Sequence, residues 1–170
     1  MMAQSMNWQE QLATDQLWMD RSIELAHQAG AQGEVPIGAL ILDSSGNYIA
    51  ASGNMKEQTQ DPTAHAEIIV LRRASQVLRN WYLDKCTLYV TLEPCPMCAG
   101  AILQSRISRL VYGTADPKAG AIHTVLNLPT SEAALHRLTV TAGIREMECH
   151  QLLEQWFINL RRSAQSPKGI

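Results

Sequence analysis

Two short segments of this chain hold side chains that commonly bind transition metals, and a shared ion would require the fold to bring the two segments together. The first is His65-Ala66-Glu67, and the second, which starts 27 residues after Glu67, is Pro94-Cys95-Pro96-Met97-Cys98. A structural zinc site has four protein ligands, whereas a catalytic site has three and keeps one position open for water. His65, Cys95 and Cys98 would be the three ligands, and Glu67 a carboxylate that need not be a ligand. This is the composition of a hydrolytic zinc site.

The spacing inside each segment indicates how its side chains are presented. Cys95 and Cys98 are three residues apart, which on a helix places both sulfur atoms on one face. His65 and Glu67 are two residues apart, a spacing that a regular helix would not stack, so we expect them at the start of a helix. Both segments should therefore lie at helix N-termini, where the helix dipole and the free N–H groups favour thiolates over thiols.

Two less specific interpretations of the same residues are open. A Cys95–Cys98 redox pair is disfavoured, because Pro96-Met97 is not the usual small-residue insert and because a His-x-Glu segment lies upstream. A closed structural zinc site is disfavoured, because no second pair of ligands occurs at close spacing. It would take its fourth ligand from Cys86, Cys149, His123, His136 or His150.

Length and composition indicate one domain over residues 1–170, with a core over about residues 14–162 between a loose N-terminus and a short C-terminal tail. A hydrophobic share of 46% is enough for a real core. The chain begins with no signal-peptide pattern and has no long apolar run, so we expect a cytoplasmic protein without membrane contact. The net charge of -2 neither indicates nor excludes nucleic acid, since binding depends on local patches.

Hydrophobic periodicity predicts strands that alternate with helices, which is typical of an α/β layered fold around a mixed sheet. The predicted helices cover residues 15–29, the residues from just after Thr63 to about 78, residues 95–105, and residues 146 to about 162. The apolar side of the second helix includes Val77, and that of the last helix includes Trp156, Phe157 and Leu160. The predicted strands are 35–42, 48–52, 87–92, 110–112 and 138–141.

The H-x-E…P-C-x-x-C pattern is the signature of zinc-dependent nucleobase deaminases. Longer stretches around it resemble the bacterial tRNA-specific adenosine deaminases of the cytidine deaminase-like superfamily, over about residues 14–162. The resemblance rests on residues 34–39, 53–54, 61–68, 91–102, 105–107 and 116–121.

The resemblance implies a three-layer α/β/α, cytidine deaminase-like fold with a five-stranded mixed sheet. It implies hydrolytic conversion of the wobble adenosine of a tRNA to inosine, with release of ammonia, most specifically in an arginine tRNA with an ACG anticodon. The expected partners are a tRNA anticodon loop and a second copy of the chain, with the loop bound near the interface of the homodimer. One zinc ion per subunit is implied, and no organic cofactor.

Roles for individual residues follow from the same resemblance. His65, Cys95 and Cys98 would hold zinc, which lowers the pKa of a bound water to about 7, and Glu67 would carry protons from that water to the base. Substrate contacts are implied for Asn54 and the Ala66 backbone at the nucleoside, for Val35, Leu92 and Pro94 in the pocket wall, for Asp116 and Lys118 on the RNA-facing loop, and for His136 with Arg137.

The chain departs from the family pattern at two positions. Leu135 stands before His136 where many members have Asn, and Ala115 stands before Asp116 where a basic residue is common. We therefore expect RNA affinity to depend on the pocket more than on long-range charge.

Three rivals of this interpretation are open. A free guanine or, second, a free cytosine deaminase would share the zinc chemistry, but residues 116–121 and the C-terminal helix favour tRNA. An inactive, zinc-stabilised RNA-binding subunit is disfavoured by the presence of Glu67, which such subunits commonly lack. The third rival is the redox protein considered above.

Overall fold

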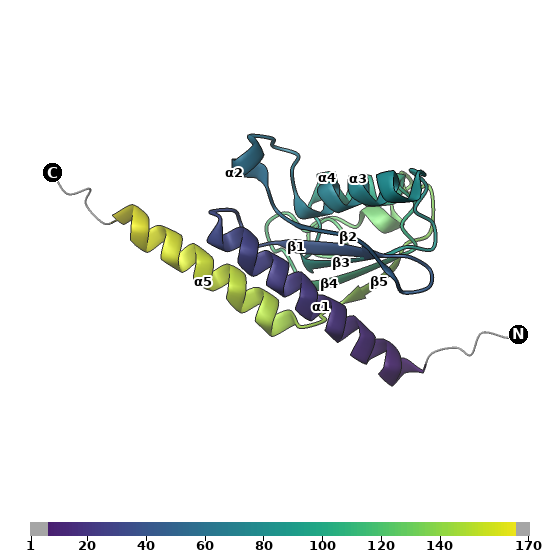
Figure 1. The fold of residues 1–170 in the computed structure, drawn as a ribbon, viewed down its shortest axis with the longest axis horizontal. Coiled ribbons are helices and arrows are strands. Elements are labelled where there is room, and N and C mark those ends of the chain that lie inside the picture. The colour runs from purple at the N-terminus through teal and green to yellow at the C-terminus, as the bar shows by residue number, and fades with distance from the viewer. Residues whose placement is uncertain (1–6, 166–170) are drawn as a thin grey trace, which may run out of the picture.

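The computed structural model describes residues 7–165, and its centre is a five-stranded mixed sheet (Figure 1). The strand order is β2-β1-β3-β4-β5. The strands are antiparallel between β1 and both of its neighbours, and parallel from β3 through β4 to β5. Their bounds are β1 Gly38–Leu42, β2 Tyr48–Gly53, β3 Thr87–Leu92, β4 Arg109–Thr114 and β5 Thr139–Ala142.

Helices cover both faces of the sheet, which makes the three-layer α/β/α architecture that the family resemblance implied (Figure 1). Helices α3 (Ala66–Leu78) and α4 (Pro96–Gln104) lie on one face, and α1 (Trp8–Ala31) and α5 (Glu146–Gln165) lie on the other. All five residues of β1 are buried, as expected for a strand covered on both faces. Two short elements that the sequence did not predict are α2 (Lys56–Thr59) and a 3₁₀ turn at Leu128–Thr130.

The N-terminal part of the chain is more ordered than the sequence pattern suggested. The prediction of a loose stretch up to residue 13 was wrong, because α1 already begins at Trp8. Asn7 caps this helix by accepting from the Glu10 N–H at 2.9 Å, while the Asn7 N–H donates to the Glu10 carboxylate at 3.1 Å. This capping box, which reads Asn-x-x-Glu in the sequence, starts the helix about two turns earlier than the apolar periodicity indicated. Residues 1–6 lie outside the described part of the chain.

Two further predictions needed correction. The first strand starts at Gly38 rather than at residue 35, so Val35 belongs to the segment that leads into the sheet. Val77, which the helical pattern placed on the buried side of α3, is 64% exposed, whereas Ile68 and Leu71 are buried instead. No helix in residues 7–165 is long and apolar enough to cross a membrane.

A buried ion pair fastens α1 to the sheet. Asp15 of α1 is 2% exposed and accepts two hydrogen bonds from the Arg109 guanidinium of β4, at 2.7 and 2.6 Å. It also accepts from the Tyr89 hydroxyl of β3 at 2.7 Å. Burial by itself raises the pKa of Asp15, but the bonds and charge of Arg109 and the bond from Tyr89 lower it on balance. The ionised carboxylate therefore stabilises the docking of α1.

We expect Asp15→Asn to lower the free energy of unfolding by about 3 kcal/mol at neutral pH, because it leaves the Arg109 charge without a carboxylate in a largely buried place. That loss corresponds to a melting temperature lower by roughly 6–12 °C. The pKa of Asp15 is lower in the folded protein than in the unfolded chain, where it is near 4. Asp15 therefore contributes its full share to the free energy of unfolding above the unfolded-state pKa, and this share is lost as the pH falls through the folded-state pKa. Thermal unfolding of both proteins from pH 7 to pH 3 should show their stabilities converging at the acidic end.

The matched control is Asp20→Asn, which breaks the pair with Arg145 at 2.8 Å on the surface. This exposed pair should contribute less than about 1 kcal/mol. Equal effects of the two substitutions would contradict the role given to the buried pair.

Candidate metal centre

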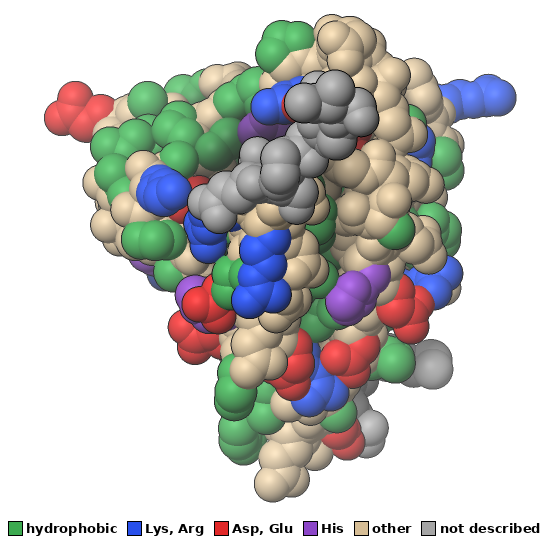
Figure 2. All heavy atoms as spheres, turned by 90° about the vertical axis from the view of Figure 1, so that its left-hand side faces the viewer, with side chains coloured by type: hydrophobic (Ala, Val, Ile, Leu, Met, Phe, Trp, Pro, Cys, Tyr) green, Lys and Arg blue, Asp and Glu red, His purple; other side chains and the backbone are tan. Residues whose placement is uncertain are grey.

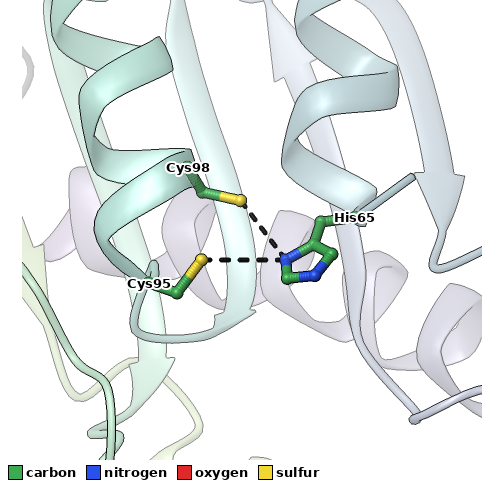
Figure 3. A group of neighbouring side chains, drawn as sticks. All are labelled: His65, Cys95 and Cys98. Atoms are coloured by element: carbon green, nitrogen blue, oxygen red, sulfur yellow. Dashed lines mark hydrogen bonds between the residues drawn. The ribbon is translucent and has the colours of Figure 1, made fainter. Parts of the chain in front are cut away.

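The predicted metal-binding residues meet where two helices begin (Figure 3). His65 is the N-cap residue of α3, and Cys95 is the N-cap residue of α4. Cys98 lies in the first turn of α4, and Glu67 is the second residue of α3. Placement at helix N-termini is what the spacing of the two segments predicted. Helices α3 and α4 pack side by side on one face of the sheet, which brings the two segments together.

The distances between the three ligand atoms fit a zinc ion. The His65 Nδ1 atom lies 3.8 Å from Cys95 Sγ and 3.5 Å from Cys98 Sγ (Figure 3). All three atoms lie within 4.8 Å of one another. Zn–S bonds of about 2.3 Å and Zn–N bonds of about 2.0 Å at tetrahedral angles would separate nitrogen from sulfur by about 3.5 Å. The two nitrogen–sulfur distances are therefore close to those of a tetrahedral zinc site.

No fourth ligand joins this group within residues 7–165. Cys86 and Cys149 are buried in the two hydrophobic cores, on opposite faces of the sheet. The candidate histidines 123, 136 and 150 are likewise outside the group. The residues beyond the described range include no His, Cys, Asp or Glu. The three-ligand arrangement therefore has the composition of a catalytic rather than a closed structural site.

The ligand side chains also have the electrostatics of a metal site. Hydrogen bonds from Cys98 and His65 lower the pKa of Cys95 to about 4, although burial opposes them. The bond to Cys95 and burial raise the pKa of Cys98. The pKa of His65 is raised, and its hydrogen bond with Cys95 is the largest cause. A lowered pKa favours the thiolate of Cys95, and thiolates are the form in which cysteines ligate zinc.

Glu67 differs from the other carboxylates of the protein in having an unused oxygen in a buried place. It is 4% exposed, and its Oε2 atom has no hydrogen-bond partner among the described residues. Burial raises the pKa of Glu67. A buried oxygen without a partner is costly, so such an atom commonly marks a place where a reactant binds. Glu67 is therefore suited to exchange protons with a reactant bound at this oxygen.

Asn54 is positioned by the helix that carries Glu67. Its Oδ1 atom accepts a hydrogen bond of 2.8 Å from the Ala66 N–H at the start of α3, and the side chain is 5% exposed. The bond fixes the orientation of the amide, so the NH2 group of Asn54 is left for other partners. It also occupies the Ala66 N–H, so a base contact by the Ala66 backbone would have to use its carbonyl group.

Val35 lines two hollows, and one of them reaches the metal-binding residue His65. One, of about 520 Å³, includes Asn54 and His65 in its lining. The other, of about 330 Å³, includes Leu92, Asp116 and Lys118. Five of the predicted substrate residues therefore line one or the other of two hollows that share Val35. Pro94 is buried and lines neither hollow; its carbonyl accepts from the Ala121 N–H at 2.9 Å.

His136 is not brought to this centre. Its Nε2 atom lies 2.7 Å from the Ile107 carbonyl oxygen, beyond the C-terminal end of α4, whereas Cys95 caps the opposite end. A helix of nine residues is about 13 Å long. Leu135 is 60% exposed in the same region, and its carbonyl accepts from Arg106. A larger hollow of about 790 Å³ between α1 and α5 also contains none of the metal-binding residues.

Sequence reasoning missed several residues of the site. Trp156 and Leu160 of α5 line the first hollow with Lys56, and Phe157 lines the second. Periodicity had assigned these α5 side chains to a core-facing stripe, but Phe157 and Leu160 are 40% and 49% exposed. Glu93 was also missed, although a charged residue at the end of an apolar strand was a usable signal. Burial alone raises the pKa of Glu93, but hydrogen bonds from Thr124 and His123 lower it on balance.

Comparison with known proteins adds the family context. Residues 13–161 match the MafB19-like deaminase family. A tRNA-specific adenosine deaminase of Bacillus subtilis is 41% identical over 92% of this chain and 97% of its own length. A solved structure from studies of A-to-I editing by tRNA:A34 deaminases has a TM-score of 0.78 and 42% identity, covering 81% of this chain and 99% of that one. The guanine deaminase of Nitrosomonas europaea superposes with a TM-score of 0.70 but is only 25% identical, over 91% of this chain and 96% of its own.

Proposed function

The chain belongs to the MafB19-like deaminase family and, within it, to the tRNA-specific adenosine deaminases, and from that premise we propose that it hydrolyses the adenosine at position 34 of a tRNA to inosine. The observation that carries the proposal is the buried Glu67 oxygen without a partner, beside three and only three potential zinc ligands in residues 7–165. The relatives supply the substrate class, since a free guanine deaminase shares the fold at lower identity.

In the proposed reaction, His65, Cys95 and Cys98 hold one zinc ion per subunit. When bound, zinc would lower the pKa of a water molecule to about 7 and so supply the nucleophile at neutral pH. Glu67 would take one proton of that water and deliver it to a ring nitrogen of the purine, and would then carry the second proton, from the new hydroxyl group, to the departing amino group. The balance is adenosine plus water to inosine plus ammonia. Hydrolysis requires no organic cofactor.

Recognition of the nucleoside would come from the groups around this centre. Enzymes that act on a base take it out of its stack and bind it in a pocket, and an unpaired anticodon loop makes this easier. The Asn54 NH2 group, with its oxygen already fixed by Ala66, would donate to the extruded nucleoside. Val35 and Leu92 would form the wall, whereas Pro94 is buried and lines neither hollow, so its placement gives no support to a contact. Asp116 and Lys118 would face the flanking RNA. The placement of His136 gives no support to a contact at this site.

The finer proposals are a homodimer and an arginine tRNA with an ACG anticodon, acted on in the cytoplasm. Support for the homodimer comes from an apolar surface on α3 and α4 beside Trp81, which is 66% exposed. A hollow of about 540 Å³ there is lined partly by Ile68, Leu71 and Ala101. Exposed apolar patches of this kind commonly mark protein interfaces.

The test of the proposed function is the incubation of the zinc-loaded protein with an unmodified arginine tRNA transcript bearing an ACG anticodon. Reverse transcription should report inosine at the wobble position, and free guanine, cytosine and adenosine should remain unchanged. A folded, zinc-loaded protein that converts free guanine but not the transcript would establish the guanine deaminase alternative instead.

We expect the affinity for this transcript to depend only moderately on salt. Among residues 7–165, side chains of both charges lie on the end of the molecule toward which the C-terminal part of α5 projects, and the basic ones form no continuous surface there (Figures 1 and 2). Each phosphate neutralised on a single strand contributes about -0.7 to the slope of log K against log salt concentration. Binding isotherms of an inactive variant, measured over a range of salt concentrations, should therefore give a slope that corresponds to fewer than about five neutralised phosphates. A steeper slope would contradict the prediction.

A further inference from the structure

The loop that carries Asp116 and Lys118 is held by one buried carboxylate. Glu93 is 1% exposed and lies at the end of β3, two residues before the metal-binding Cys95. Its Oε1 atom accepts from three consecutive backbone N–H groups, those of Ile122, His123 and Thr124, at 3.1, 2.7 and 3.0 Å. Its Oε2 atom accepts from the Asp116 N–H at 3.1 Å and from the Thr124 hydroxyl. One carboxylate thus binds both ends of the loop.

Other contacts show how closely the loop is fitted to this carboxylate. A Cβ atom on Gly120 would lie 2.3 Å from Glu93 Oε2, so the backbone passes the carboxylate at a distance that only glycine permits. The neighbouring Pro94 carbonyl accepts from the Ala121 N–H at 2.9 Å. Within the loop, the Asp116 carboxylate accepts from the Lys118 and Ala119 N–H groups. The loop is therefore built on residues 93 and 94, immediately before the metal-binding turn.

The five donors are four backbone N–H groups and one hydroxyl, and a carboxylate is the side chain that can accept from all of them. Hydrogen bonds to an ionised acceptor are about twice as strong as those between neutral groups. A glutamine has one acceptor oxygen, so its NH2 group would face either the three consecutive N–H groups or the Asp116 N–H. In the second and milder case, the end of the loop at Asp116 loses its attachment.

We propose that Glu93 is a positioning residue that fastens residues 116–124 to the turn before Cys95 and thereby holds the RNA-facing side chains of this loop in place. Glu93 acts through the loop and touches neither the substrate nor the metal. The proposal rests on the proposed function for its effect on RNA, but the attachment of the loop can be measured without RNA. If Glu93 acts in this way, its substitution should weaken the binding of RNA and leave the rate of the chemical step unchanged. A contact that stabilises the bound substrate and the transition state equally affects KM alone when it is lost.

The test compares the zinc-loaded wild type with Glu93→Gln and with Glu132→Gln, a matched control at an exposed glutamate. For Glu93→Gln we expect amide hydrogen exchange in residues 116–124 to be about tenfold faster or more, as expected when charge-assisted hydrogen bonds are lost. The KM for the tRNA transcript should rise about tenfold while kcat changes less than about threefold, with zinc content unchanged. Glu132→Gln should match the wild type in every readout. Thr124→Val, which removes only the hydroxyl donor, should lie between the two and serves if Glu93→Gln fails to fold.

Three results would overturn the proposal: exchange of the loop that is unchanged in both Glu93→Gln and Thr124→Val, a fall in kcat at constant KM, or loss of zinc from a folded variant. The last two would mean that Glu93 acts on the metal-binding turn instead of the loop. Failure of the wild type to convert RNA would refute the proposed function alone, because the hydrogen-exchange and zinc measurements would still decide whether Glu93 holds the loop.

Discussion

Glu67→Gln should reduce the rate of inosine formation by about 10³-fold or more while the protein stays folded and zinc-loaded. Glutamine has the size and the hydrogen-bonding oxygen of glutamate but cannot accept and return a proton. Since Glu67 lies in the second position of α3 and is not one of the three grouped ligands, its substitution should leave zinc in place. Single-turnover conversion of the transcript, with metal analysis on the same sample, measures both effects.

The stability of this variant gives a second readout. Glu67 is buried and has an oxygen without a partner, so the wild type holds a poorly solvated carboxylate there. Replacing it with a neutral amide should leave the free energy of unfolding unchanged or raise it by about 1 kcal/mol. Glu24→Gln on the exposed side of α1 is the control, with wild-type activity expected. Activity of Glu67→Gln within tenfold of the wild type would show that another group carries the protons.

Cys98→Ala should remove zinc from the protein and with it all measurable deamination. Cys98 is fully buried, and its sulfur lies 3.5 Å from His65 Nδ1, so the substitution takes away one of three ligands. Two remaining ligands are too few for a zinc site in a protein. Metal analysis should give about one zinc per chain for the wild type and near none for the variant. A chelator should lower the melting temperature of the wild type but not that of Cys98→Ala, since a bound metal stabilises only the folded state.

The matched control is Cys86→Ala, which also removes a buried thiol. Cys86 is 3% exposed and lies in the core between the sheet and helices α3 and α4. Its loss should cost about 1 kcal/mol of stability through a small cavity and leave zinc and activity intact. Zinc retained by Cys98→Ala, or lost by Cys86→Ala, would contradict the assigned ligand set.

Local rules predicted a large part of the site. The i,i+3 spacing of Cys95 and Cys98 and the two-residue spacing of His65 and Glu67 predicted helix starts, and both segments do begin helices. These rules work because they depend on backbone geometry within one turn. The same kind of local signal, the Asn7–Glu10 capping box, was present at the N-terminus but was overlooked.

Periodicity identified buried faces less well, because it does not tell a core from a pocket. Phe157 and Leu160 have the spacing of core residues, yet each lines one of the two hollows that share Val35. Val77 continues the apolar stripe of α3 one residue before the helix ends, yet it is exposed. Apolar side chains at the rim of a fold obey the same pattern as those in its interior.

Residue identities and local spacing were enough to predict the ligand types, the presence of Glu67, the alternation of strands and helices, and the family. Those features depend on residue identity and on contacts within a few positions. Only the tertiary structure decided that no fourth ligand joins the three within residues 7–165, that His136 lies near the far end of α4, and that Glu93 binds residues as distant as Thr124. These outcomes depend on which segments the sheet brings side by side. Contacts across tens of residues are set by packing and by the need to satisfy buried polar groups, and spacing along the chain does not encode them.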